Sequence, residues 1–210
     1  ISKAMTGFGI GLPDLDNDGD KDMVTANGRV TRRNRLPGED FWGDYAERNQ
    51  IAINEGGGRF TEYLSATDPF LTPVSVSRGL AILDFDNNGK QDCLVTTAAN
   101  EPRLYRNIFE RSGNWIGFQL IDPALGGRNM LGAIIEITTE EQETYRGTVQ
   151  SDGSYQSAND SRVHFGLGRQ IRILKTIVYW PGSSPEEFQI DAVNQYYRLE
   201  KGQGKNSLAK

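Results

Sequence analysis

The chain has 210 residues, which is enough for one or two domains with a sizeable hydrophobic core. Its formal net charge of −5 argues against nucleic acid and anionic membrane as partners, and its single cysteine excludes an intrachain disulfide. No apolar run is long enough for membrane insertion, and 24 glycines with few stretches of helical periodicity favour a fold made mostly of β-strands.

The first predicted element is a β-hairpin whose two strands are joined by an acidic loop. Strand-favouring residues occupy positions 9–12 and 23–26. Between them, oxygen-bearing side chains fall at loop positions one, three, five and nine, and a glycine falls at position six, which is the spacing of a compact calcium loop. Carboxylates this close together repel one another without a cation between them. The predicted ligands are Asp14, Asp16, Asp18 and Asp22, together with the backbone carbonyl of Asp20.

A charged and aromatic segment follows at residues 28–49, before strand-like residues at 50–54 and 60–63. An insertion of this length on a β scaffold is often functional, and it is equally well explained as a solvated excursion whose aromatic residues pack back on the sheet. Two functional hypotheses use it. A carbohydrate-binding module would use Trp42, Tyr45 or, outside this segment, Trp180. A polysaccharide-active enzyme would use Glu39, Asp40 and Asp44 as acid groups for glycoside hydrolysis, although their spacing is not diagnostic.

The acidic loop then recurs, flanked by strand-like residues at 80–83 and 93–96. Position twelve of an EF-hand is a bidentate Glu, but here it is Thr25 or Val95, so each loop is predicted to join two strands. The second loop has an amide at position five, which predicts weaker binding. Its predicted ligands are Asp84, Asp86, Asn88 and Asp92, with the backbone carbonyl of Lys90. The alternative is a pair of turns rich in Asp, Asn and Gly that hold no ion.

The character of the chain changes after residue 114, where about six alternating segments are separated by turn signals. The predicted fold is therefore all-β: two propeller-type blades, forming a partial β-propeller, at residues 1–110, then a small antiparallel β-sandwich at 111–201 and a frayed tail at 202–210. Cys93 is interpreted as a buried apolar residue, Trp180 as a core residue, and His164 as a structural residue at the sandwich edge.

Three motifs in this second half carry a family resemblance: Gly153–Ser157, Arg162–Gly168 and Val178–Gly182. With them, the stretch from residue 114 to about 201 resembles the ASPIC/UnbV domain, and the two acidic loops with their strands resemble the FG-GAP/VCBS calcium repeats that precede it in the cartilage acidic protein-like family. The Gly153–Ser157 motif would be either a polar binding face or a turn that satisfies backbone groups.

The resemblance implies a calcium-binding adhesion or interaction protein with two Ca²⁺ sites and no catalytic activity. It implies a secreted, periplasmic or cell-surface location and a protein or glycan partner. Two blades do not close a propeller, so we expect the C-terminal part of a longer protein that self-associates through open blade edges. The alternatives are a carbohydrate-binding module and a fragment of a polysaccharide-active enzyme.

Overall fold

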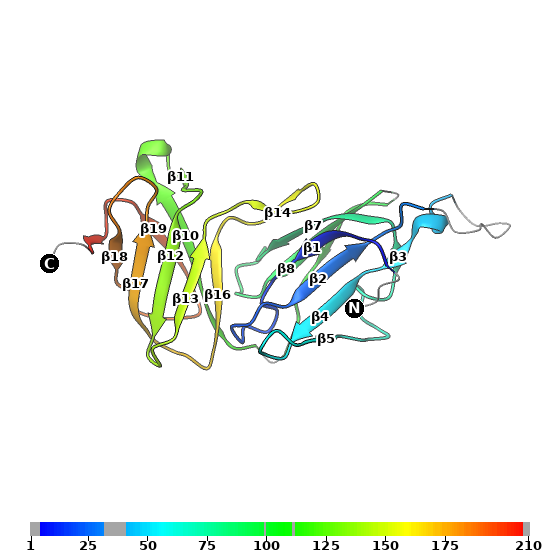
Figure 1. Cartoon of the computed structure of the whole chain (residues 1–210), viewed down its shortest axis with the longest axis horizontal. Coiled ribbons are helices and arrows are strands. Elements are labelled where there is room, and N and C mark those ends of the chain that lie inside the picture. The colour runs from blue at the N-terminus through cyan, green and yellow to red at the C-terminus, as the bar shows by residue number, and fades with distance from the viewer. Residues whose placement is uncertain (1–4, 32–40, 99, 111, 208–210) are drawn as a thin grey trace.

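The structure is a computed structural model that describes residues 5–31, 41–98, 100–110 and 112–207. The all-β prediction is confirmed, because strands dominate and the two helices of the described residues are single 3₁₀ turns, η1 (Gly43–Tyr45) and η2 (Pro123–Leu125). Neither is long and apolar enough to cross a membrane. Figure 1 shows two β-lobes side by side, which we call the repeat lobe (residues 5–110) and the C-terminal lobe (residues 112–207).

The first sheet of the repeat lobe is a four-stranded antiparallel meander in the order β1-β2-β4-β5. All four strands lie within two residues of the segments that the sequence predicts. The acidic loop joins the first two of them. The strands are β1 (Gly7–Gly11), β2 (Met23–Asn27), β4 (Gln50–Asn54) and β5 (Phe60–Glu62), and β3 (Glu47–Arg48) pairs with β6 (Val74–Ser75) beside them.

The second sheet repeats this arrangement with three strands, in the order β7-β8-β9, and so has one strand fewer than the first. The strands are β7 (Ser77–Leu83), β8 (Asp92–Thr97) and β9 (Arg103–Tyr105). After β9 the backbone N–H of Asn107 donates to Asp92 and its side-chain amide donates to the carbonyl of Leu15, both at 2.7 Å. The chain then continues to the C-terminal lobe instead of turning back along β9.

The two sheets of the repeat lobe meet most closely where β1 passes β7. A Cβ atom added to Gly9 would lie 2.6 Å from the Cβ of Leu80, so a larger residue at that position would push the sheets apart. The shared core includes Leu15, Val24, Leu80 and Val95. Cys93 belongs to the same core, where burial raises the pKa of its thiol to about 12, and its interpretation as a buried apolar residue is confirmed.

The C-terminal lobe consists of two sheets around one core, which is formed by residues such as Ile116, Phe118, Ile135 and Val178. Trp180 lies in this core as predicted. One sheet holds β10 (Asn114–Asp122), β11 (Arg128–Asn129), β16 (Val163–Gly168) and β19 (Tyr196–Glu200), and the other holds β12 (Ile134–Thr139), β13 (Thr144–Thr148), β17 (Ile173–Tyr179), β18 (Glu186–Phe188) and β20 (Lys205–Asn206).

Two features of this lobe differ from the sequence prediction. First, β19 pairs with β10 in parallel, so one of the two sheets is mixed and not purely antiparallel. Second, the tail expected to fray beyond Gly202 contains β20, which pairs with β18. The backbone N–H groups of Gly202 and Gly204 also donate to the Glu186 carboxylate, and these bonds order the segment.

A two-stranded arm, β14 (Asp152–Ser154) and β15 (Ser157–Ala158), extends from the C-terminal lobe toward β1 and β7 of the repeat lobe (Figure 1). The Ser154 hydroxyl accepts a hydrogen bond from the backbone N–H of Ile10 at 2.7 Å. Asn159 accepts one from the backbone N–H of Ile82 at 2.9 Å. The Gly153–Ser157 motif therefore does satisfy backbone groups: Ser154 accepts from a backbone N–H of the other lobe, and Ser157 donates to the carbonyl of Tyr155 within the motif.

Candidate metal centre

The two acidic loops adopt the same backbone geometry. In the first, the Asp14 carboxylate accepts hydrogen bonds from the backbone N–H groups of Asp18 and Gly19, at 3.1 and 3.0 Å. In the second, the Asp84 carboxylate accepts from the equivalent N–H groups of Asn88 and Gly89, at 3.1 and 2.7 Å. The glycine at position six has a positive φ in both loops, +100° and +83°, as does the asparagine at position four.

The aspartate at position nine ties each loop to the neighbouring strand. The Asp22 carboxylate accepts from the backbone N–H groups of Leu15 and Asn54, at 2.8 and 2.9 Å. Asp92 accepts from those of Phe85 and Asn107, at 3.1 and 2.7 Å. Both aspartates are only 1% exposed. The matched bonds at Asn54 and Asn107 show that the internal repeat extends beyond the loops.

Each loop gathers three carboxylates closely enough to hold one metal ion. One oxygen from each member of a group lies within 4.8 Å of the others. In the second loop, Asn88 keeps its side-chain oxygen near the group by accepting from the backbone N–H of Lys90 at 2.8 Å, and in the first loop Asp18 accepts from Asp20 in the same way. The groups are Asp14, Asp16 and Asp18, and Asp84, Asp86 and Asp92.

The electrostatics of the first loop favour a bound cation. Burial raises the pKa of Asp14 to about 7 and that of Asp22 to about 6, and burial followed by the charge of Asp18 raises the pKa of Asp16. In addition, one buried oxygen of Asp16 has no hydrogen-bond partner in the structure. A buried oxygen without a donor, among carboxylates that are costly to ionise, fits a site for a hard divalent cation.

The two loops differ in which carboxylates meet cations of the protein itself. In the first loop the charge of Lys21 acts on Asp14 and Asp22. In the second, Arg106 forms an ion pair with Asp86 at 2.8 Å, at the position where Asp16 has an unpartnered oxygen, and the Lys90 ammonium donates to the backbone carbonyl of Phe109. Burial also raises the pKa of Asp92.

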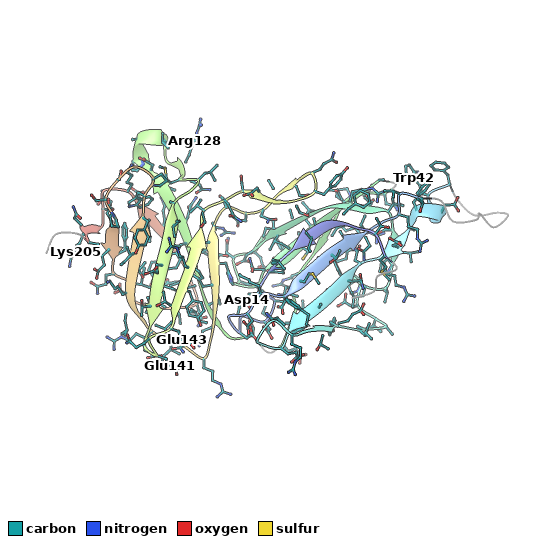
Figure 2. All side chains as sticks on the ribbon, viewed as in Figure 1. Asp14, Trp42, Arg128, Glu141, Glu143 and Lys205 are labelled. Carbon is teal, nitrogen blue, oxygen red and sulfur yellow. The ribbon has the colours of Figure 1, made fainter. Side chains whose placement is uncertain are left out.

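The loops lie where the two lobes meet, and they contact each other. Figure 2 labels Asp14 at this junction. The Asn17 amide donates to the backbone carbonyl of Gly89 at 3.0 Å, linking the first loop to the second. From the C-terminal lobe, the backbone N–H of Gly168 donates to the carbonyl of Asn17 at 2.7 Å, and the Tyr196 hydroxyl donates to the Asp84 carboxylate at 2.8 Å.

These contacts between lobes involve residues that sequence reasoning missed. His164 lies on β16, an edge strand of its sheet, as predicted, but this edge is buried in the junction, and the His164 ring lies 3.0 Å from the carbonyl of Gly89. Burial, with the nearby charges of Lys21 and Arg162, lowers the pKa of His164 to about 3. The only signal in the sequence was the Arg162–Gly168 motif itself, which carried no information about its contact with the loops.

The candidates for sugar binding and hydrolysis lie elsewhere. Trp42 packs against Phe41 with ring centroids 5.2 Å apart, at the end of the repeat lobe farthest from the C-terminal lobe (Figure 2). Tyr45 lies beside both rings. Asp44 is 2% exposed, whereas Glu39 and Asp40 lie outside the described residues.

Comparison with known protein families gives two matches. The model of the FG-GAP-like repeat matches residues 14–95, from the first candidate ligand of the first loop to β8, the strand that follows the second loop in sequence. The model of ASPIC and UnbV matches residues 125–206, which include the arm and the strands β16 and β19. No curated protein matches the chain. The chain therefore has an FG-GAP-like repeat region followed by an ASPIC and UnbV domain.

Proposed function

We propose that this chain is a calcium-binding interaction module of an extracellular protein, in which two Ca²⁺ ions stabilise the β scaffold. The observation that carries the proposal is the duplicated loop, with the same carboxylate and backbone geometry in both copies. All candidate ligands are oxygen atoms, which suit calcium and do not suit the softer transition metals. FG-GAP-like repeats and ASPIC/UnbV domains are typical of extracellular proteins, which supports a secreted, periplasmic or cell-surface location.

The chain's own residues would bind and orient the ion. Asp14, Asp16 and Asp18 would hold the first ion, with Asp22 bracing the loop through its two backbone hydrogen bonds. Asp84, Asp86 and Asp92 would hold the second ion. A bound ion supplies positive charge that offsets the repulsion of the carboxylates and fixes the ends of the hairpin. This role is structural, and the proposal assigns no catalytic step to the chain.

The fold supports the same proposal. We interpret the two sheets of the repeat lobe as propeller-type blades and the two sheets of the C-terminal lobe as a sandwich. In the described residues β5 and β9 each end a sheet, and such edges pair readily with other strands. A protein or glycan partner at the cell surface and self-association through these edges are therefore part of the proposal.

Calorimetric titration of metal-stripped protein with Ca²⁺ tests the proposal. We expect two sites, the first tighter than the second, and loss of the tighter one in Asp16→Ala. Asp191→Ala, which removes an exposed carboxylate outside the loops, is the control and should retain both sites. A titration without heat in the wild-type protein, together with unchanged melting in calcium and in chelator, would contradict calcium binding.

Thermal unfolding of the same variants tests the mechanism. An ion that binds only the folded state stabilises it by about 3 kcal/mol at a concentration 100 times the dissociation constant. Asp16→Ala should lose stabilisation of this order in calcium. In chelator it should melt at or above the wild-type temperature, because a repelling carboxylate has been removed. An equal loss in both conditions would show that Asp16 acts through packing and not through the ion.

The carbohydrate-binding alternative is supported by the exposed aromatic rings of Phe41 and Trp42. A glycan array probed with wild-type protein and with Trp42→Ala distinguishes it, because binding that is lost in this variant would place the ligand at that end of the repeat lobe. Turnover of a chromogenic glycoside panel would favour the polysaccharide-active enzyme.

A further inference from the structure

The second acidic loop is enclosed by side chains of the C-terminal lobe, whereas the first loop meets mainly its backbone. Gly113 and Gly168 donate backbone N–H groups to the first loop, each at 2.7 Å. At the second loop, the Tyr196 hydroxyl donates to Oδ2 of Asp84 at 2.8 Å, and Arg162 donates to the Asp84 carbonyl at 2.8 Å. The first candidate ligand of the second loop is thus held partly by another lobe.

The hydroxyl of Tyr196 is itself held in place. The guanidinium of Arg162 lies 4.1 Å from the centroid of the Tyr196 ring and is paired with Asp160 at 2.6 Å. The ring also contacts Trp115, with centroids 4.9 Å apart, and the backbone of Gly117. These neighbours restrict the position of the hydroxyl, so its hydrogen bond restricts the orientation of the Asp84 carboxylate.

The same aromatic group contacts the turn of the loop. A Cβ atom added to Gly89 would overlap the indole of Trp115, so the backbone of position six packs directly on this ring. Trp115 also stacks on His164, with centroids 5.8 Å apart and an interplanar angle of 12°. Any movement of the loop on binding a cation would therefore be transmitted to β10, β16 and β19.

We propose that Tyr196 is a positioning residue for the second calcium loop, and that calcium in this loop and docking of the C-terminal lobe stabilise each other. The inference rests on the proposed function. Oδ2 of Asp84 accepts from both Gly89 and Tyr196, and Oδ1 accepts from the backbone N–H of Asn88, so three hydrogen bonds hold this carboxylate in one orientation beside the other carboxylates of the group. A carboxylate oriented before binding loses less conformational freedom when the ion arrives, and coupling between ion and lobe must act equally in both directions.

The test isolates the second site in the Asp16→Ala background and compares two adjacent tyrosines. Tyr196→Phe removes only the hydroxyl, and Ca²⁺ affinity should fall by about fivefold, which corresponds to one hydrogen bond. The matched control is Tyr197→Phe. The Tyr197 hydroxyl donates to the carbonyl of Ala192 at 3.0 Å and accepts from Gln195, and neither contact belongs to a loop. Its removal should leave the affinity unchanged.

Amide hydrogen exchange measures the same coupling as an effect of the bound ion on the C-terminal lobe. Ca²⁺ should slow amide hydrogen exchange in β16 and β19 of the Asp16→Ala parent, and should slow it less in Tyr196→Phe. A purely structural role would alter melting in chelator without changing the calcium dependence. Terbium luminescence excited through tryptophan checks the location, because Trp115→Phe should reduce it in this background.

The outcomes separate this inference from the proposed function. If the parent binds Ca²⁺ and both tyrosine variants bind it equally well, or if Tyr196→Phe binds more tightly, the positioning role is wrong while calcium binding stands. If the Asp16→Ala parent binds no Ca²⁺ but the wild-type protein binds two ions, Tyr196→Phe is measured in the wild-type background instead. The affinity of the weaker binding step must then fall, and an unchanged affinity at that step overturns the inference. If the wild-type protein binds no Ca²⁺, both proposals fail.

Discussion

One pair of equivalent residues makes the two acidic loops chemically different. Asn54 and Asn107 make the same bond to position nine of their loops, so Ile53 in the first repeat corresponds to Arg106 in the second. Ile53 offers no charge, and one oxygen of Asp16 remains without a partner. Arg106 instead pairs with Asp86. Asp86 of the second loop is therefore paired with a cation that competes with calcium, whereas in the first loop the charge of Lys21 acts on Asp14 and Asp22 and leaves that oxygen of Asp16 unpaired. The second loop also lacks the carboxylate at position five.

We predict that Arg106→Gln tightens calcium binding at the second site. The guanidinium side chain is 59% exposed, so solvent screens it and the gain should be at most about fivefold, the equivalent of an exposed ion pair. Calorimetry of the weaker binding step measures this. Arg103→Gln, three residues earlier at the start of β9 and without an ion pair among the described residues, is the control. Weaker binding in Arg106→Gln would mean that this ion pair orients Asp86 for the cation.

We also predict that His164 makes the protein less stable as the pH falls. Its folded-state pKa of about 3 lies below the ordinary value of 6.5, so the unfolded chain takes up the proton first. The stability is therefore complete above about pH 6.5 and declines as the pH falls from there toward 3. At pH 5 the loss should be about 2 kcal/mol.

Denaturant unfolding of the wild-type protein and His164→Gln at several pH values, in one fixed calcium concentration, measures this term. The difference in unfolding free energy between the two proteins isolates the contribution of His164. The raised pKa values of Asp14 and Asp22, about 7 and about 6, contribute to the pH dependence of both proteins. The difference in unfolding free energy should shift by about 2 kcal/mol between pH 7 and pH 5. A constant difference over this range would show that His164 is accessible to protons in the folded state.

At the scale of elements, the hairpins were predictable because their information is local. The oxygen side chains, the glycine at position six and the two flanking strands lie within about 20 residues of sequence, and each repeats. The same holds for the strands β4 and β5. Three carboxylates in each loop come together as the spacing requires, although nothing in the local sequence predicts that Arg106 pairs with one of them.

Elements that depend on distant partners were not predictable in this way. The parallel pairing of β19 with β10 joins Tyr196 to Gly117, and no local pattern specifies a partner so far away. The arm β14–β15 is polar and short, and its strand character comes from its own pairing and from bonds to Ile10 and Ile82 in the other lobe. The position of the tail likewise depends on Glu186.

At the scale of the whole molecule, each lobe has a separate core, and polar contacts join them at the loops and the arm. We predict that the C-terminal lobe folds when expressed alone, because both of its sheets and their shared core are contained within it. The repeat lobe alone exposes the edges of β5 and β9 and loses the contacts that brace its loops. It should associate with other copies or lose cooperative unfolding.

Expression of residues 1–110 and 111–210 as separate chains checks this, with amide dispersion by NMR and mass by sedimentation as readouts. Mixing the two fragments with and without Ca²⁺ provides the control, since reassociation in calcium would show that the fragments are competent. A monomeric, cooperatively melting repeat fragment beside an unfolded C-terminal fragment would reverse the assignment of domains.

The parallel pair β10–β19 also has a consequence for how the protein is made. β10 is the first strand of the C-terminal lobe to leave the ribosome, but one of its neighbours is synthesised only after the whole of the other sheet except β20. Until then one edge of β10 is open, and Tyr196, which begins β19, has not reached the second loop. The hairpins can close early during synthesis, whereas the junction between the lobes is completed only when nearly all of this chain has been translated.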